Sequence, residues 1–332
     1  MEIQARIAGF VALGQQLMRQ NNPALEEVKQ RAQTENAWFL PSFIDASMKQ
    51  ISRQFLQEPA LMEWTSLYPN ISKTFTQKKI GIVMAGNIPM VGFHDLLSTL
   101  MAGHIAVVKL SSKDKVLMDY IIQSLKTIEP LWEDQIIIIQ DQLKNCDAYI
   151  ATGSNNTSQY FEYYFGKFPH IIRKNKTSIA ILEGNETAEE LSLLADDMML
   201  YFGMGCRNVT QLWVPNGYNF EPLLAALKKY DFILDNHKYK HNYDYQLALL
   251  MMTRQFYMNT GSILLSENSS PFAAISQVHY QYYEPGTTPE FNMEEIQCIV
   301  GKAGLDFGSL QAPKLSQYAD GVDTLAFLSD LN

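Results

Sequence analysis

The chain has 332 residues, of which 47% are hydrophobic and 18% are charged. These proportions are typical of a folded globular protein and exclude a disordered or fibrous chain, and the length favours two domains over one. The net charge of −9 lacks the basic surplus with which nucleic-acid-binding proteins neutralise phosphates, so no nucleic acid is expected as a partner.

The N-terminal segment mixes charged with apolar residues and is typical of an amphipathic helix rather than a signal peptide. The most apolar later run, at 136–139, is far shorter than the ~20 residues that span a bilayer, so no membrane span is expected. The three cysteines are odd in number, far apart and outside any CxxC pattern: Cys146, Cys206 and Cys298. We therefore expect reduced thiols, no metal site and a cytoplasmic protein.

Residues 1–75 alternate helical periodicity with proline-containing breaks, which predicts a helical lead-in packed on the domain that comes next in the chain. Short apolar strands then alternate with helices of three or four turns. The predicted strands lie at 79–86, 104–110, 134–140, 146–153 and 176–182. Because they lack polar alternation, we expect a parallel sheet covered on both faces, the doubly wound α/β architecture of a dinucleotide-binding domain at 76–182.

A second α/β domain, expected to be the catalytic one, is predicted at 183–300. It begins with a helix at 187–202 and continues with a strand at 209–215 that ends in proline. Residues 301–332 are expected either to close the cleft between the domains or to return to the dinucleotide-binding domain. Such a cleft is where a ligand site is expected.

The segment GMGCRN at 203–208 places a cysteine after two glycines and before an arginine, between the predicted helix and strand. The glycines would let the backbone approach a substrate, the Cys206 amide could donate to an oxyanion, and Arg207 could favour the thiolate. The alternative is a buried core cysteine at the same junction. For Cys146 and Cys298, which lie in apolar strand-like runs, core packing is the favoured interpretation.

The loop AGNIPM at 85–90 follows the first predicted strand, at the carboxyl end where ligands bind in this architecture. Asn87 could present its amide to developing negative charge, and Pro89 would begin the next helix. The alternative, which this segment alone favours, is a tight turn in which Asn87 caps that helix.

The second predicted strand ends in VVKLSSK at 107–113, where an acidic residue would hold the 2′-hydroxyl of NAD. Lys109, Ser111, Ser112 and Lys113 stand there instead, a pattern that favours NADPH. A solvated loop whose lysines have no ligand is the alternative.

A further strand–turn–helix segment, IATGSNNTS at 150–158, has a helix start of the kind that binds phosphate, although no GxGxxG or Walker motif occurs. Glu183, at the end of the last predicted strand, could be a general base or a helix-terminal charge. The two histidines of HKYKH at 237–241 lack a third metal ligand, which favours a solvated helix face.

The succession of these features carries more information than any one of them. A loop with Asn and Pro, a strand ending in Lys, a strand ending in Gly-Ser, a strand with Glu and then Gly-x-Gly-Cys resembles the aldehyde dehydrogenase superfamily. Within it, the chain is similar to the LuxC-type acyl-CoA reductases, the fatty acid reductases of bacterial luminescence. The segments that carry this similarity are NAWFLPSFIDASMKQI, MAGNIPMVGFHDLLSTLMAGHIAVVKLSSKD, GMGCRNV and SQYADGVDTLAFL.

The resemblance implies an aldehyde dehydrogenase-like fold in which Cys206 attacks an acyl thioester. Asn87 would match the oxyanion-hole asparagine of the family, acting together with the Cys206 amide. Hydride would come from NADPH, so the Glu that activates water in hydrolytic aldehyde dehydrogenases is not needed. Glu183, which is closer in sequence to the cysteine than that Glu usually is, is kept as a further candidate.

The resemblance also implies a set of cofactor contacts. Lys109 would hold the adenosine ribose, and Gly153 and Ser154 would form the turn beneath the cofactor phosphates. Ser112 falls where NAD-preferring relatives carry Glu, which favours NADPH. Glu295 would grip the nicotinamide ribose, although a glutamine replaces the phenylalanine usual two positions later.

The predicted activity is therefore NADPH-dependent reduction of a fatty acyl thioester to an aldehyde, with CoA or an acyl-carrier protein as the acyl donor. An acyl-protein synthetase and a second copy of the chain are the expected protein partners. Three alternatives stay open: a cysteine acyltransferase or thioesterase without nicotinamide chemistry, a non-catalytic scaffold relative, and a dehydrogenase that oxidises a short semialdehyde.

Overall fold

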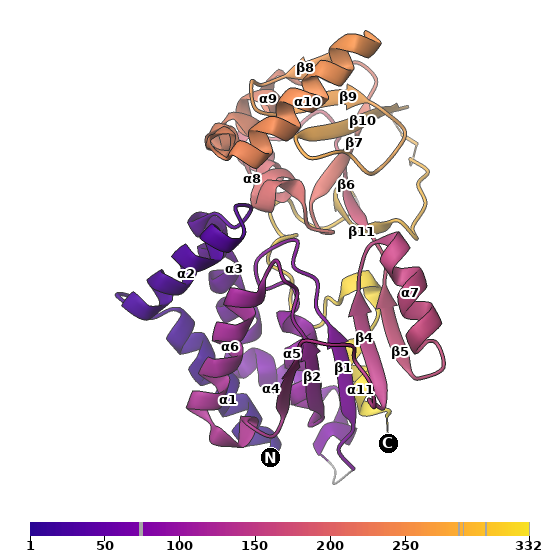
Figure 1. Ribbon diagram of the computed structural model, residues 1–332. Coiled ribbons are helices and arrows are strands. Elements are labelled where there is room, and N and C mark those ends of the chain that lie inside the picture. The colour runs from indigo at the N-terminus through magenta and orange to yellow at the C-terminus, as the bar shows by residue number, and fades with distance from the viewer. Residues whose placement is uncertain (73–75, 285, 288, 303, 332) are drawn as a thin grey trace. The chain divides into compact units, whose positions relative to one another are not determined.

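The computed structural model describes residues 1–72, 76–284, 286–287, 289–302 and 304–331 (Figure 1). The chain divides into two compact units, and each is described by itself. The first unit comprises Met1–Asn175 together with Pro313–Asn332, and the second comprises Lys176–Ala312.

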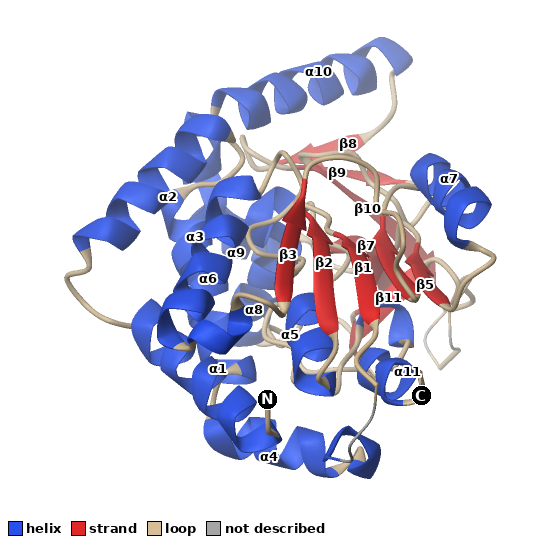
Figure 2. Ribbon diagram, turned by 60° about the horizontal axis from the view of Figure 1, so that its bottom comes forward, coloured by secondary structure: helices blue, strands red, loops and turns tan. Residues whose placement is uncertain are grey.

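The first unit is built on a five-stranded sheet in the order β3-β2-β1-β4-β5, with every neighbouring pair parallel (Figure 2). Its strands are β1 (Lys79–Val83), β2 (Ile105–Lys109), β3 (Ile136–Ile139), β4 (Ala148–Thr152) and β5 (His170–Arg173). The strand order reverses between β1 and β4, and in open parallel sheets ligands bind at the carboxyl ends of the strands at such a point.

Helices cover both faces of this sheet. On one face the apolar side chains of alternate strand residues, such as Ile80 and Ile82, join a core with the helices of the N-terminal segment. On the other face Tyr149 stacks on Phe165 with ring centroids 4.2 Å apart. The helices of this unit are α1 (Ile3–Leu17), α2 (Pro23–Glu35), α3 (Pro41–Gln50), α4 (Glu58–Ser66), α5 (Phe93–Ala102), α6 (Lys115–Ile128), α7 (Asn155–Phe165) and α11 (Thr324–Ser329).

Several of these helices begin at residues that satisfy their free amides. Asn22 accepts from the Leu25 amide and is followed by Pro23 at the first position of α2. Short π or 3-10 turns supplement the α-helices of the unit at Ile51–Phe55, Pro69–Ser72, Pro130–Trp132 and Ala319–Gly321.

The parallel sheet with helices on both faces, preceded in the chain by helices, confirms the predicted doubly wound sheet with a helical lead-in.

The residues after 312 return to the first unit and are held there by polar contacts. Tyr318 accepts a hydrogen bond from Trp64 Nε1 at 2.7 Å, and its hydroxyl is 2.9 Å from that of Tyr68. The His104 ring lies 2.9 Å from the Leu328 carbonyl oxygen. The C-terminal segment is therefore an integral part of the first unit.

The second unit contains a six-stranded sheet in the order β11-β6-β7-β10-β9-β8. Its pairs are parallel except for the edge pair β8 and β9. The strands are β6 (Thr177–Ile181), β7 (Val209–Pro215), β8 (Tyr257–Asn259), β9 (Leu264–Glu267), β10 (Gln277–Tyr283) and β11 (Ile296–Gly301). The helices are α8 (Ala188–Met199), α9 (Glu221–Leu227) and α10 (His237–Thr253), with 3-10 turns at Leu200–Gly203 and Lys228–Asp235.

The strand expected at 176–182 forms as β6, but it pairs with β7 and β11 in the second sheet rather than with the strands of the dinucleotide-binding domain. Its burial is complete over all five residues, as is usual for an interior parallel strand. The HKYKH segment lies in the first turns of α10, with both histidines exposed. No described helix has the length and hydropathy that a membrane crossing needs.

Candidate functional site

Cys206 lies in a short loop between the 3-10 turn Leu200–Gly203 and β7, and it is half-buried. The predicted helix ends earlier than expected, at Met199, because Tyr201 and Phe202 adopt left-handed φ values of 57° and 58°. Such conformations cost non-glycine residues about 1–3 kcal/mol each and persist only where the surroundings impose them. The backbone before Cys206 is therefore held in a defined and strained shape.

Asn208 is the residue that imposes this shape. Its side chain is fully buried, and its Oδ1 accepts from the Gly205 amide at 2.8 Å. Its Nδ2 donates to the carbonyl oxygens of Asp197 and Leu200, each at 2.9 Å. The sequence pattern drew attention to the cysteine and gave no role to this asparagine, although a buried amide with both ends bonded fixes the whole turn.

The Cys206 loop lies at the amino end of the parallel strands of the second sheet. Ser178, at the start of β6, donates from its hydroxyl to the Cys206 carbonyl oxygen at 3.0 Å. The Thr177 amide donates to the Glu295 carbonyl oxygen at 3.0 Å, just before β11. The structure thus brings Cys206 and Glu295, far apart in sequence, to the same edge of one sheet.

Cys298 is a neighbour at this edge that the sequence interpretation assigned to core packing. It is half-buried on β11, next to an irregularity in the register between Ile296 and Ile299. Arg207 Nη1 lies 3.2 Å from its sulfur. Burial raises the pKa of the Cys298 thiol, and the nearby Arg207 charge opposes that rise. Arg207, which was expected to act on Cys206, contacts the thiol of Cys298. Cys146 is buried in the core of the first unit as expected, and burial raises its pKa to about 11.

Glu183 lies at the other edge of the second sheet. It follows the carboxyl end of β6, whereas Cys206 precedes the amino end of the parallel neighbour β7. Its carboxylate is exposed and pairs with Lys302 Nζ at 2.8 Å, just after β11. The length of a strand therefore separates Glu183 from the cysteine.

Asp197 connects the Cys206 loop to the chain after β11. Its carboxylate is fully buried and accepts from the Gly308 amide at 2.6 Å and the Leu310 amide at 3.1 Å. Burial raises the pKa of Asp197 from 3.8 to about 7, despite these two amides.

We expect this shift to make the second unit less stable as the pH rises. Because the folded-state pKa exceeds the unfolded one, the contribution of Asp197 to stability is complete below about pH 4 and is lost as the pH rises through about 7. Asp197→Asn should remove that part of the pH dependence while lowering absolute stability, because its amide nitrogen faces a backbone N–H. Urea unfolding of both proteins between pH 4 and 8 gives the free energy of unfolding at each pH. The same dependence of this free energy on pH in both proteins would refute the assignment to Asp197.

In the first unit, Asn87 lies in the loop between β1 and α5, beside the reversal in strand order, and its side chain is exposed. The helix begins at Phe93 with Gly92 at its N-cap position, so the expectations that Pro89 begins it or that Asn87 caps it are wrong. The reason is local: Met90 adopts a φ of 57°, which ends any helical path through 87–92.

Lys109 ends β2 and lines an open pocket of about 600 Å³ at the carboxyl ends of β2 and β3. The other lining residues are Gln140, Asp141, Gln142 and Lys144. None of these four was singled out in the sequence, since a loop after a strand shows no pattern of its own. Asp141 matters most, because it brings a carboxylate to a pocket where the sequence analysis expected only cations and hydroxyls.

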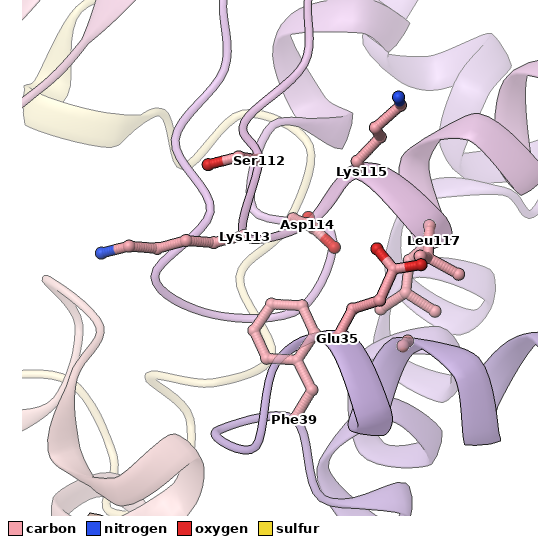
Figure 3. Close-up of a pocket in the computed structure, with 9 residues that line it drawn as sticks. Glu35, Phe39, Ser112, Lys113, Asp114, Lys115 and Leu117 are labelled. Carbon is pink, nitrogen blue, oxygen red and sulfur yellow. The ribbon is translucent and has the colours of Figure 1, made fainter.

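Ser111 and Ser112 lie in the turn between β2 and α6. The Ser111 hydroxyl accepts from the Lys113 amide at 3.3 Å, whereas Ser112 is exposed. Ser112 lines a second hollow, too narrow to hold a water molecule, together with Glu35 and Asp114 (Figure 3). There the Glu35 side chain of α2 extends toward Asp114, while the Lys113 ammonium group points outward (Figure 3).

Gly153 and Ser154 follow β4, on the other side of the strand-order reversal from β2. Ser154 is the N-cap of α7, where its hydroxyl accepts from the Thr157 amide at 3.4 Å. Gly153 cannot carry a side chain without displacing Phe161 and Thr157, which a Cβ would approach to 2.9–3.0 Å. Among the described residues no group of three metal-ligating side chains forms, so no metal centre is assigned.

A family model described as acyl-CoA reductase (LuxC) matches residues 15–238, more than half of the chain. No curated protein matches the chain.

Solved structures of aldehyde dehydrogenases are similar in fold. The enzyme from Mycobacterium tuberculosis, complexed with NAD+, has a TM-score of 0.61 and 14% identity over 86% of this chain and 69% of its own. An indole-3-acetaldehyde dehydrogenase, also complexed with NAD+, has a TM-score of 0.65 and 14% identity over 86% and 68%. Aldehyde dehydrogenase 21 from Physcomitrella patens, complexed with the product succinate, has a TM-score of 0.65 and 13% identity over 91% and 74%. At these identities the similarity shows the fold.

Proposed function

Because this chain belongs to the LuxC family of acyl-CoA reductases, oxidoreductases that act on acyl and aldehyde groups, we propose that it reduces a fatty acyl thioester to an aldehyde through an acyl-enzyme on Cys206. The observation that carries this proposal is the Cys206 loop. A half-buried thiol follows strained backbone that Asn208 holds on both sides. Such rigid presentation suits a nucleophile, whereas a core cysteine needs none.

In the first half-reaction the Cys206 thiolate attacks the thioester carbonyl carbon and forms a tetrahedral oxyanion. The Asn87 side-chain amide and the Cys206 backbone amide donate to that oxyanion; one such donor typically lowers the barrier by about 3–4 kcal/mol. The bond to the CoA sulfur then breaks, CoA leaves as a thiolate that takes a proton from solvent, and the acyl group stays on Cys206. This step needs no activated water, which is consistent with Glu183 lying at the opposite edge of the sheet.

The residues of the first unit fit a dinucleotide. The open pocket of about 600 Å³ that Lys109 lines has the size and place for the adenosine half, and Ser154 begins a helix beside the strand-order reversal, where phosphates bind. Glu295 lies at the same sheet edge as Cys206 and would hold the nicotinamide ribose. When bound, the cofactor supplies the hydride that reduces the acyl carbon, and Cys206 is then released as the leaving group of the aldehyde.

We propose NADPH as this cofactor. Lys109 and Lys144 are the two cations of the pocket and can contact a 2′-phosphate, and Asp141 is its carboxylate. Two cations against one carboxylate favour the additional phosphate of NADPH over a bare ribose hydroxyl.

Lys109→Ala is expected to raise the KM for NADPH by roughly 10- to 100-fold, since a charge-assisted hydrogen bond is worth about 1.5–3 kcal/mol. The matched control is Lys167→Ala, which removes an exposed lysine that precedes the amino end of β5, does not line the pocket and should change KM little. Steady-state kinetics give the KM of each variant for NADPH and for NADH. An unchanged KM in the Lys109 variant would show that the cofactor binds elsewhere.

The proposed function is tested by following NADPH oxidation at ~340 nm with acyl-CoA and acyl-carrier-protein thioesters of increasing chain length. The acyl adduct is followed in parallel by intact mass. Turnover together with an adduct supports the reductase, and the best thioester identifies the acyl donor. An adduct that forms without NADPH consumption would favour the acyltransferase or thioesterase alternative, and no adduct with any thioester would favour the non-catalytic scaffold.

A further inference from the structure

The loop that carries Asn87 is fixed to its surroundings at several points. It follows β1 and packs first against the turn between β2 and α6. A Cβ on Gly86 would lie 2.4 Å from the Ser111 hydroxyl oxygen and 3.1 Å from the Asp114 Cβ. The approach to Ser111 is closer than real Cβ contacts, so any other residue at position 86 would displace Ser111, and the two loops lie backbone against side chain.

A second point of attachment comes from the N-terminal helices. Ser47 of α3 is buried, and its hydroxyl donates to the Pro89 carbonyl oxygen at 2.8 Å. This bond joins residues that are 42 positions apart. It gives the helical lead-in a direct contact with the loop, two residues beyond Asn87.

The third point of attachment is Asp114. It stands at the N-cap position of α6, where an aspartate ordinarily accepts from the amides of its own helix, yet its side chain makes no such bond. Its Oδ2 instead accepts from the Met90 amide at 2.8 Å. The residue bonded in this way is the one with the left-handed φ of 57°.

Burial of the Asp114 carboxyl group costs folding free energy. Its side chain is 2% exposed, and its Oδ1 has no hydrogen-bond partner within the described part of the chain. Burial raises the pKa of Asp114 well above its ordinary value, with the Met90 amide opposing the rise. A buried carboxyl that neither caps its helix nor pairs with a cation among the described residues has one visible use here, namely the amide of Met90.

We propose that Asp114 and Ser47 are positioning residues that hold the 84–92 loop so that Asn87 presents its amide to the oxyanion. This inference rests on the proposed function, because it assigns the two side chains a role in the same acylation step. The Pro89 carbonyl and the Met90 amide are the two ends of one peptide group, so the Ser47 hydroxyl and the Asp114 carboxylate together fix its orientation, two residues beyond Asn87. Asn87 itself can stay exposed and still be held in place.

The experiment measures the rate at which Cys206 is acylated, by rapid quench and intact mass, in five proteins: the wild type, Asp114→Ala, Asp114→Asn, Asn87→Ala and the double variant Asp114→Ala with Asn87→Ala. Asp114→Ala should slow acylation by roughly 10- to 100-fold, the size of effect expected when a positioned group moves by about 1 Å. Asp114→Asn should recover most of the rate, because its carbonyl oxygen can still accept from Met90. Alkylation of Cys206 by iodoacetamide, which needs no oxyanion hole, should be the same in all of them.

The decisive comparison is made in the Asn87→Ala background. If Asp114 acts through Asn87, adding Asp114→Ala to Asn87→Ala should slow acylation no further. Ser47→Ala should behave in the same way, with a smaller effect. An equal slowing by Asp114→Ala in both backgrounds would overturn the inference, since the side chain would then act on the general fold.

Hydrogen exchange of the 84–92 segment tests the attachment of the loop independently of catalysis. Faster exchange at Met90 in Asp114→Ala, but not in Asp114→Asn, supports the attachment itself. Unchanged exchange would overturn it. A wild type that forms no acyl adduct, with iodoacetamide still reacting at Cys206, would instead overturn the proposed function and the catalytic role of the attachment with it.

Discussion

Cys206→Ala is expected to abolish the acyl adduct and to reduce NADPH-dependent turnover by at least roughly 10⁴-fold, the scale on which enzymes lose activity with their nucleophile. The loss should be catalytic rather than structural. The loop is held by Asn208, the Ser178 hydroxyl and the backbone, and none of these bonds uses the Cys206 sulfur. The variant should therefore unfold at nearly the same urea concentration as the wild type.

Two other cysteine variants control for the reactivity of thiols in general. Cys146→Ala lies in the core of the first unit and should keep the adduct and the turnover. Cys298 lies at the same sheet edge as Cys206, so Cys298→Ala tests whether the adduct requires the Cys206 thiol itself or any thiol at this edge. Peptide mapping that located the adduct on Cys298 in the wild type would refute the assignment of the nucleophile.

Asp95→Ala is expected to lower the free energy of unfolding of the first unit by about 3–5 kcal/mol. Asp95 of α5 and Arg173 of β5 form an ion pair at 2.6 Å, with side chains that are 10% and 5% exposed. Arg173 also donates to the Thr324 hydroxyl at 2.8 Å, at the start of α11. Without the carboxylate, the buried guanidinium loses its counter-charge in a place that is shielded from solvent.

The expected loss arises because Arg173 is left buried without its carboxylate. It can be distinguished from the net contribution of the ion pair to the free energy of unfolding. A double variant, Asp95→Leu with Arg173→Met, removes both charges and should recover most of the lost stability, as buried pairs replaced by apolar residues often do. Arg31→Ala breaks an exposed pair with Glu35 in the same unit and should cost less than about 1 kcal/mol. Hydrogen exchange of first-unit peptides in urea gives the measurement. A loss below about 1 kcal/mol for Asp95→Ala would contradict the burial of this pair.

Local patterns in the sequence were sufficient for most elements of the fold. Runs such as 104–110 and 209–215 are β-branched and bounded by polar or proline residues, and both form strands within a residue or two of their expected limits. The pairing of β6 could not be read in this way. A strand that is buried on both faces has the same composition in either sheet, and only its hydrogen-bond partners, about 30 and 120 residues further along the chain, decide which sheet it joins.

The site divides along the same line. Cys206 and Asn87 could be proposed from the sequence because glycine and proline mark their loops. Asn208 and Asp114 were missed because their importance comes from where their bonding partners lie, and nothing in the neighbouring letters shows those partners. The separation of Glu183 from Cys206 does follow from a general rule. In neighbouring parallel strands, the residue after one strand and the residue before the next lie at opposite edges of the sheet.

The return of residues 313–331 to the first unit has a consequence for how the protein is made. At roughly 5–20 residues per second, about 8–30 s of synthesis pass between Arg173 and the segment that contains Thr324. Over that interval Arg173 cannot donate to Thr324 and Trp64 cannot donate to Tyr318, because these two residues have not yet been synthesised. The last residue of the second unit is therefore synthesised before the segment that closes the core of the first unit. The synthesis of the first unit begins before that of the second and ends after it.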